Sequence, residues 1–474
     1  MIKKQLKILV AISLLLTIVV VALLWFANPD EDHSSVEPSI LISKDFFDVM
    51  DISINNEHSE IYVVQENGGF RMQDISSEII NVEYLQQLIA DVAYIEYLEK
   101  ITNTSDLSLF GLAEPMSLVN IRYKDNSVLQ ISVGDAGPLE NSRYIRLNQE
   151  DEVYLVNHAS TIRFLMPIEN YIDFIIVEPH QVQDVMSTIS YVEYSGKLLD
   201  RPIIIKRVNN DDENEVRLAS SFGVASHLMI EPTIQKVDLR EAIYQFEGLV
   251  GLLNHGVAAY NADEATIKAY NLDNPDIVVI YDFSPDDQSP PTRYLLEASI
   301  IDNQGYVMVN RNGVIHKIID EAFLSIAYEK MISRWFYTPL LLDVEQVIVT
   351  YNNQQIEFEI ERLGNNEIEV VSNNEIINAS LFRKLYNLIV SASHDGTYSP
   401  FSKQDHQKLL EITFAYSDDE KQPNVISYYS HSARRHGVCF EETCEFLIRD
   451  TFVDFVIEAI ESIKENNDFS VSWE

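Results

Sequence analysis

A short phrase of residues occurs twice in the sequence, and this repetition limits the possible folds more than any other feature. The first copy, Phe110-Gly111-Leu112-Ala113-Glu114-Pro115, is a turn that ends in proline and leads into an alternating apolar stretch. The second copy, Tyr270-Asn271-Leu272-Asp273-Asn274-Pro275, leads into another apolar stretch. Glycine and proline mark turns, and apolar residues at every second position are typical of a half-buried strand. These two segments, called the turn phrases below, predict that the chain is built from repeated units.

Other landmarks recur in the same order around the turn phrases. Each unit is expected to contain a leading strand, a hairpin, one main helix, a further strand, a late hairpin and a short amphipathic stretch. The main helices are predicted to begin at the capping residues Asn81, Asp238 and Asn378. In the second unit, the first hairpin is predicted to join strands at 203–205 and 216–218 through a solvated acidic loop.

The repeated order predicts an α+β fold of mostly antiparallel sheet with one main packed helix in each unit. A chain of 474 residues, 46% hydrophobic, can bury several cores. We expect tandem copies at 45–178, 180–340 and 341–474, the third diverged, with three unrelated domains as the alternative. Before them we expect a cytoplasmic tip and transmembrane anchor at 1–28 and a spacer at 29–44.

The anchor prediction rests on residues 8–27, an uncharged apolar run long enough to cross a bilayer as a helix. Lysines precede the run and acidic residues follow it, which places the N-terminus in the cytoplasm and the body outside. A cleaved signal peptide is the competing interpretation. The run is long for a signal peptide, and Trp25 stands where cleavage needs a small residue. We therefore expect an uncleaved signal anchor and a single-pass cell-membrane protein.

The charge balance excludes one class of partner. Lys and Arg total 34 against 74 Asp and Glu, a net charge of -40 at pH 7. Such a surface repels the phosphates of nucleic acids, so we expect no nucleic-acid partner. The sequence has no phosphate-cradling glycine loop, no H-E-x-x-H motif and no G-x-S-x-G motif. We accordingly expect no cofactor and assign no catalytic residue.

The two cysteines, Cys439 and Cys444, are predicted to face each other in the late hairpin of the third unit. With a turn at 441–442, they form the second pair from the turn, a pair without ladder hydrogen bonds and with Cα atoms about 4.5 Å apart. That separation suits a disulfide, and a compartment outside the membrane permits oxidation. We expect a structural disulfide, with a redox role as the alternative.

One basic cluster lies beside these cysteines in an otherwise acidic body. It consists of His431, Arg434, Arg435 and His436. Three interpretations are open for it: a patch that docks an anion or a partner, a zinc site, and the ordinary exposed flank of a hairpin. The spacing of the histidines and cysteines is poor for zinc.

The turn phrases and their surroundings resemble domain-of-unknown-function family 4340. The match is carried by Phe110, Gly111, Leu112 and Pro115 in the first copy and by Tyr270, Leu272, Asp273 and Pro275 in the second. In the second copy, Asn271 stands where the family usually has glycine. The resemblance implies a bacterial protein with one N-terminal membrane helix and an extracytoplasmic body, often encoded beside ABC transporters of the gliding-motility type. No enzymatic activity is established for the family, so the resemblance implies a location and a genomic neighbourhood only.

From these observations we expect a non-catalytic, membrane-anchored extracytoplasmic binding or scaffolding protein. Its expected partners are the membrane, through residues 8–27, and a membrane-protein complex such as an ABC transporter or envelope assembly. The alternative is an extracytoplasmic hydrolase that uses an Asp/Glu pair in a cleft between units. With so many acidic residues, suitable pairs arise by chance and none is singled out.

Overall fold

The structure is a computed structural model, and it describes residues 39–73, 75–102, 104, 106–286, 288–319, 321–365 and 367–473. The predicted anchor at 8–27 lies outside the described residues. Within the described ranges, no helix is long and apolar enough to cross a membrane. The chain divides into two compact units, one ending at Ile172 and one beginning at Asp173.

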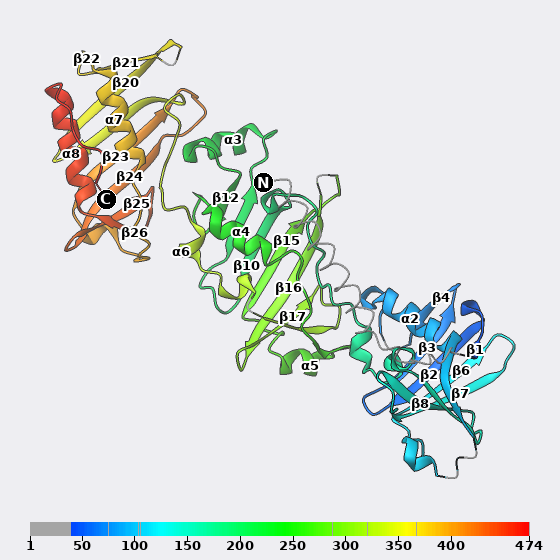
Figure 1. Cartoon of the computed structure of the whole chain (residues 1–474). Helices are drawn as coiled ribbons and strands as arrows, with labels where there is room; N and C mark the ends of the chain where they lie inside the picture. The colour runs from blue at the N-terminus through cyan, green and yellow to red at the C-terminus, as the bar shows by residue number, and fades with distance from the viewer. Residues whose placement is uncertain are drawn as a thin grey trace, which may run out of the picture. The chain divides into compact units, whose positions relative to one another are not determined.

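The first compact unit contains one nine-stranded antiparallel sheet with the order β1-β5-β9-β8-β7-β6-β2-β3-β4 (Figure 1). Helix α2 (Val82–Ala93) packs against it through buried aliphatic residues, among them Leu88 and Ile89. The strands are β1 (Ser39–Ser43), β2 (Val49–Asn56), β3 (Glu60–Glu66), β4 (Gly69–Met72), β5 (Tyr94–Ile101), β6 (Ser117–Tyr123), β7 (Val128–Ala136), β8 (Ser142–Leu147) and β9 (Val153–Asn157). The 3-10 turns are η1 (Phe46–Asp48), η2 (Ser77–Ile79), η3 (Leu107–Phe110), η4 (His158–Ser160), η5 (Ile162–Phe164) and η6 (Ile168–Tyr171).

The second compact unit contains a nine-stranded sheet, β13-β12-β11-β10-β15-β16-β17-β18-β14, followed by an eight-stranded sheet, β22-β21-β20-β19-β23-β24-β25-β26. The strands of the former are β10 (Ile189–Ser195), β11 (Ile203–Arg207), β12 (His227–Glu231), β13 (Gln235–Lys236), β14 (Val257–Ala259), β15 (Ile277–Phe283), β16 (Thr292–Ile301), β17 (Gln304–Val309) and β18 (Ile315–Ile318). The strands of the latter are β19 (Val344–Tyr351), β20 (Gln354–Gly364), β21 (Glu367–Ser372), β22 (Glu375–Ile377), β23 (Lys408–Tyr416), β24 (Asn424–Ser432), β25 (Arg435–Phe440) and β26 (Thr443–Arg449).

Helices and 3-10 turns pack against these two sheets and connect their strands. In the eight-stranded sheet, α7 and α8 lie side by side (Figure 1). The helices are α3 (Glu213–Ala219), α4 (Leu239–Glu247), α5 (Glu264–Ala269), α6 (Tyr328–Met331), α7 (Ala379–Val390) and α8 (Thr451–Lys464), and the 3-10 turns are η7 (Val185–Ser187), η8 (Ser220–Phe222), η9 (Ala322–Ser325) and η10 (Lys403–Asp405).

All three sheets share a seven-stranded core with one strand order. The order is β4-β3-β2-β6-β7-β8-β9 in the first sheet, β12-β11-β10-β15-β16-β17-β18 in the second and β21-β20-β19-β23-β24-β25-β26 in the third. The predicted repetition and the predicted α+β class of mostly antiparallel sheet are confirmed. The predicted boundaries between copies stay predictions, because the buried residues of the second and third sheets form one continuous hydrophobic cluster.

The main helices begin where the sequence predicts. Helices α2, α4 and α7 each follow a capping residue, Asn81, Asp238 and Asn378 respectively. Each cap oxygen accepts a hydrogen bond from a backbone N–H two or three residues later: Tyr84 at 2.9 Å, Glu241 at 3.0 Å and Ser380 at 3.0 Å. These bonds satisfy N–H groups that have no partner within the helix.

The predicted strand at 216–218 is wrong, since these residues lie in helix α3. Strand β11 pairs instead with β12, where Ile205 faces Met229. The predicted acidic loop is the start of this helix: Asp212 accepts hydrogen bonds from the backbone N–H groups of Asn214 and Glu215. Acidic residues in a first turn favour a helix because they complement the positive end of its dipole.

We expect Asn81→Ala to lower the free energy of unfolding of the first compact unit by about 1 kcal/mol, because the substitution removes the cap of α2. Asn81→Asp keeps an acceptor oxygen at the helix N-terminus and is expected to retain stability. Differential scanning calorimetry of the two variants measures the difference. Equal transition midpoints for both variants would contradict this role of the cap.

Candidate functional site

The two turn phrases have the same backbone geometry. Gly111 and Asn271 both adopt the left-handed conformation, with φ of 64° and 57°. The next residue in each copy donates its N–H to a carbonyl five residues back, Leu112 to Leu107 and Leu272 to Ile267, both at 3.0 Å. This bond is typical of the turn that ends a helix with a left-handed residue. Asparagine enters this conformation more readily than most residues, which explains why Asn271 can replace glycine.

The aromatic ring of each turn phrase packs on the same strand position. The ring of Phe110 lies 4.9 Å from that of Tyr144 on β8, and the ring of Tyr270 lies 4.8 Å from that of Tyr306 on β17. The aromatic residue of each turn phrase therefore packs against a tyrosine on the neighbouring strand. The remaining residues of the signature end the turn: Pro115 and Pro275 each precede a sheet strand by two positions, and Asp273 is exposed.

In the third copy, the strand position that carries Tyr144 and Tyr306 in the other copies has a different residue. By strand pairing, Gly437 on β25 takes the position of Tyr144 and Tyr306. The ring of Phe401 occupies the space above it, and a Cβ at Gly437 would lie 2.4 Å from that ring. Phe401 thus supplies an aromatic ring at this position of the third copy.

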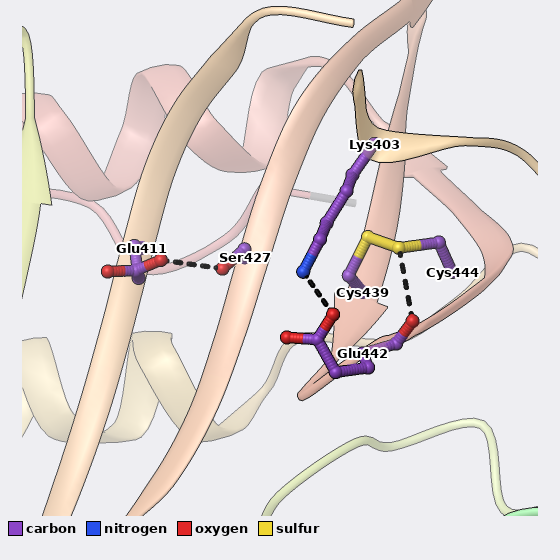
Figure 2. Close-up of a disulfide and its surroundings, with 6 residues drawn as sticks. All are labelled: Lys403, Glu411, Ser427, Cys439, Glu442 and Cys444. Carbon is purple, nitrogen blue, oxygen red and sulfur yellow. Dashed lines mark hydrogen bonds and ion pairs between the residues drawn. A yellow bond between two sulfur atoms is a disulfide. The ribbon is translucent and has the colours of Figure 1, made fainter. Parts of the chain in front are cut away.

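Cys439 and Cys444 lie opposite each other on β25 and β26 and are joined by a disulfide (Figure 2). Their Cα atoms are 4.1 Å apart. Both are buried in a small cluster with Tyr429, against which Phe401 packs. At the turn beside them, Lys403 forms an ion pair with Glu442 (Figure 2). The bridge therefore closes a short hairpin over a packed aromatic patch, which suits a structural role.

We expect mass spectrometry of protein alkylated without reduction to find no modified thiol at Cys439 or Cys444. The two side chains meet at adjacent strand positions, where a disulfide has little backbone movement to impose. A reduced and then alkylated sample is the control, and it should carry two modified thiols. Two modified thiols before reduction would show that the bond does not form in the native protein.

The basic cluster gathers at the β24–β25 turn, and its members have different surroundings. Arg435 pairs with Asp395, and Arg434 is exposed at a turn position with φ of 67°. The ring of His431 stacks on that of His406 at 5.2 Å, and burial lowers the pKa of His431. Burial also lowers the pKa of His436. Only part of the cluster thus offers positive charge to a partner.

A cavity of about 530 Å³ lies between helix α3 and the β23–β24 connection, where the second copy meets the third. Sequence reasoning missed it, because its walls come from segments some two hundred positions apart. The lining residues are Asn210, Glu213, Val216, Arg217, Ser220, Leu342, Asp343, Tyr416, Ser417, Asp418 and Lys421. Two cationic side chains line the cavity, Arg217 from the second copy and Lys421 from the third.

Lys421 has an unusual environment for a lysine. Its Nζ donates a hydrogen bond to Ser220 Oγ at 2.6 Å and lies 3.3 Å from the centre of the Tyr416 ring. Burial lowers the pKa of the Lys421 ammonium to about 8. A lysine with a lowered pKa in a cavity is a candidate for ligand binding or chemistry.

Arg217 holds the other wall of the cavity through ion pairs. Its Nε donates to Asp418 at 2.6 Å, and its Nη2 lies 2.8 Å from Glu420. The hydrogen bond from Arg217 lowers the pKa of Asp418, so this carboxyl stays ionised near neutral pH. These ion pairs therefore link the second copy to the third beside the cavity. Because Asp418 stays ionised, it is unsuited to donate a proton.

A second charged cluster joins the same two copies. Arg201 Nη2 lies 2.6 Å from a carboxylate oxygen of the buried Glu445, and its guanidinium lies 4.6 Å from the ring centre of Tyr328. The Tyr328 hydroxyl donates to Glu445 at 2.8 Å. Glu445 is buried and Arg201 is half-buried, so removing Arg201 would leave the Glu445 carboxylate without its cation. This cluster therefore stabilises the packing of the second copy against the third.

One carboxyl with a raised pKa lies elsewhere, in the first compact unit. Burial raises the pKa of Asp91 to about 6. The carboxylate is bound by Arg163 at 2.6 Å, and Arg163 also bonds Gln87. Asp91 thus attaches η5 to α2. Within the described residues, no group of three or more His, Cys, Asp and Glu side chains could hold a metal ion.

We expect Lys421 to react with an amine-directed acylating reagent at pH 8 at least about tenfold faster than Lys403. Burial lowers the pKa of Lys421, whereas the hydrogen bond with Glu442 raises that of Lys403. Peptide mapping by mass spectrometry measures both rates on one sample, and the ratio should shrink as pH rises to 10. Equal rates at pH 8 would show that Lys421 is an ordinary lysine.

Comparison with known proteins adds one match to this geometry. The family described as "Domain of unknown function (DUF4340)" matches residues 80–275. No curated protein and no solved structure matches the chain. The matched residues include both turn phrases and the helices α2 and α4, so the predicted resemblance is confirmed. Over residues 80–275, the chain is similar to the DUF4340 family of domains of unknown function.

Proposed function

We propose that this protein is a non-catalytic, membrane-anchored extracytoplasmic binding or scaffolding protein that serves a membrane-protein complex such as an ABC transporter or envelope assembly. The observation that carries the proposal is the cavity between the second and third copies. Two of its charged groups already form an ion pair, Arg217 with Asp418, and Lys421 is hydrogen-bonded to Ser220. A surface already organised by such pairs is suited to recognise a ligand or partner by shape and hydrogen bonding.

The same cavity is where the alternative, a hydrolase, would place its carboxylates. A glycosidase needs one carboxyl that is protonated near neutral pH and a second that is ionised. Arg217 lowers the pKa of Asp418, which opposes the first role. Asp91, whose pKa is raised to about 6, belongs to the other compact unit and is bound by Arg163. Binding is therefore the better account of the cavity.

The proposed location rests on the sequence before the described residues. The run at 8–27 has the length and the flanking charges of a signal anchor. The strongly acidic body, with a net charge of -40 for the chain, suits a solvated domain held away from anionic lipid headgroups. A protein tethered in this way meets the extracytoplasmic parts of membrane complexes.

A membrane-impermeant amine cross-linker applied to intact spheroplasts is expected to join lysines of the body to another membrane protein. Lys3, Lys4 and Lys7 precede the predicted anchor and act as the internal control, because the topology places them in the cytoplasm, out of reach of the reagent. Mass spectrometry identifies the joined peptides.

Reaction at Lys3, Lys4 or Lys7 without reaction of the body would overturn the topology. Body lysines that react but join no membrane protein would overturn the scaffolding role. A hydrolytic activity of the purified protein that is abolished by Asp343→Asn would favour the hydrolase instead.

A further inference from the structure

The three sheets differ at one edge. In the second sheet, β12 is covered by the short strand β13, with Leu228 facing Lys236. In the third, β21 is covered by β22, with Val370 facing Ile377. In the first, β4 occupies the position of β12 and β21, and it is the last strand of its sheet. Among the described residues, the first copy thus has no strand on an edge that both sister copies cover with a strand of their own.

The reason for the difference lies in the chain between the edge strand and the main helix. In the second copy this stretch forms β13 and then a bridge between Val237 and Ile332. In the first copy the equivalent bridge, between Ile80 and Ile172, is present, but the stretch before it forms the 3-10 turn η2. In the first copy, the described residues between β4 and α2 therefore form no strand that pairs with β4.

An apolar groove of about 380 Å³ lies beside β4 and η2. It runs between η1, the β3–β4 turn with β4, and the start of α2. Its described lining residues are Phe46, Phe47, Gly68, Gly69, Phe70, Ser77, Ile80, Val82, Leu85 and Gln86. None of these is charged, although the chain carries a net charge of -40. The groove therefore favours apolar side chains.

Aromatic rings shape the groove, and two of its apolar residues are exposed. The ring of Phe46 lies 5.2 Å from the rings of both Phe47 and Phe70. Phe47 is 57% exposed, and Val82, at the first position of α2, is also 57% exposed. In the second copy, the 3-10 turn equivalent to η1 is η7, whose Val185 and Met186 are buried. The exposure of an apolar side chain at this 3-10 turn thus distinguishes the first copy from the second.

The backbone of β4 offers hydrogen-bonding groups beside this groove. Gln73 donates its N–H to Tyr62 on β3 at 2.9 Å. Hydrogen-bonded and non-hydrogen-bonded residues alternate along an antiparallel pair, so Arg71 also faces β3 while the amides of Phe70 and Met72 point away from it. An edge with such groups is a template for a further strand.

We propose that β4 and the adjoining groove bind an extended segment of a partner protein, which adds a strand to the first sheet and places alternate apolar side chains in the groove. Both sister copies fill this edge with a peptide strand, which argues for a peptide occupant. A lipid acyl chain would leave the outward amides of Phe70 and Met72 without acceptors. The proposal rests on the proposed binding function and names the chemistry of the partner.

The test uses the full-length protein in host membranes, with Phe47 replaced by the photo-cross-linker p-benzoylphenylalanine. The groove is challenged by Val82→Glu, which puts a carboxylate into it at a helix position where acidic residues are tolerated. The matched control is Leu239→Glu, at the first position of the sister helix α4 and likewise 57% exposed. Cross-links are located by mass spectrometry, and amide exchange of β4 is compared with and without the captured partner.

The proposal predicts cross-links to one short segment of another protein, lowered at least about tenfold by Val82→Glu and unchanged by Leu239→Glu, because burying an unpaired charge is costly. It also predicts slower exchange at Phe70 and Met72 when the partner is bound. Cross-links to lipid, to a second copy of this chain, or to nothing would overturn it, as would equal effects of the two variants. Partners captured elsewhere on the body, with none at Phe47, would overturn the strand docking and leave the scaffolding role standing.

Discussion

Each sheet depends on one strand pair at its centre. The strand that opens a copy pairs antiparallel with a later strand of the same copy: β2 with β6, β10 with β15 and β19 with β23. In all three, the register shifts by one residue just after the first pair. A shift of one residue exchanges the two faces of a strand, so this shared bulge decides which side chains lie in the core. The pairs that follow it are Ile52 with Ile121, Val192 with Tyr281 and Val347 with Phe414, all buried.

The same central strands also hold the main helices in the first two copies. The Tyr123 hydroxyl on β6 donates to the carbonyl of Val92 in the last turn of α2, and that of Tyr281 on β15 donates to Leu249 just after α4. Carbonyls at a helix end have no partner within the helix, so these bonds anchor the helix ends to the sheet. The sheet centre thus determines both the face that is buried and the element that buries it.

Local patterns in the sequence predict the elements of this fold well, and contacts between copies escape them. The caps at Asn81, Asp238 and Asn378 and the hairpin of Cys439 and Cys444 are local, so spacing and side-chain chemistry suffice. The error at 216–218 arose because three apolar-alternating residues fit a helix turn as well as a strand. The cavity around Lys421 could not be predicted, since its walls meet only after two copies pack together.

The left-handed residue of the turn phrase has a consequence for how far the similarity to the DUF4340 family reaches. Gly111 and Asn271 are selected by a backbone angle, and Phe110 and Tyr270 by a ring-packing site. The recognisable part of the sequence therefore encodes a shape that any protein with this sheet needs. Relatives that share it inherit an architecture, while their edges, grooves and junctions are free to diverge toward different tasks. Two proteins with this turn phrase can accordingly share a sheet architecture and still differ in function.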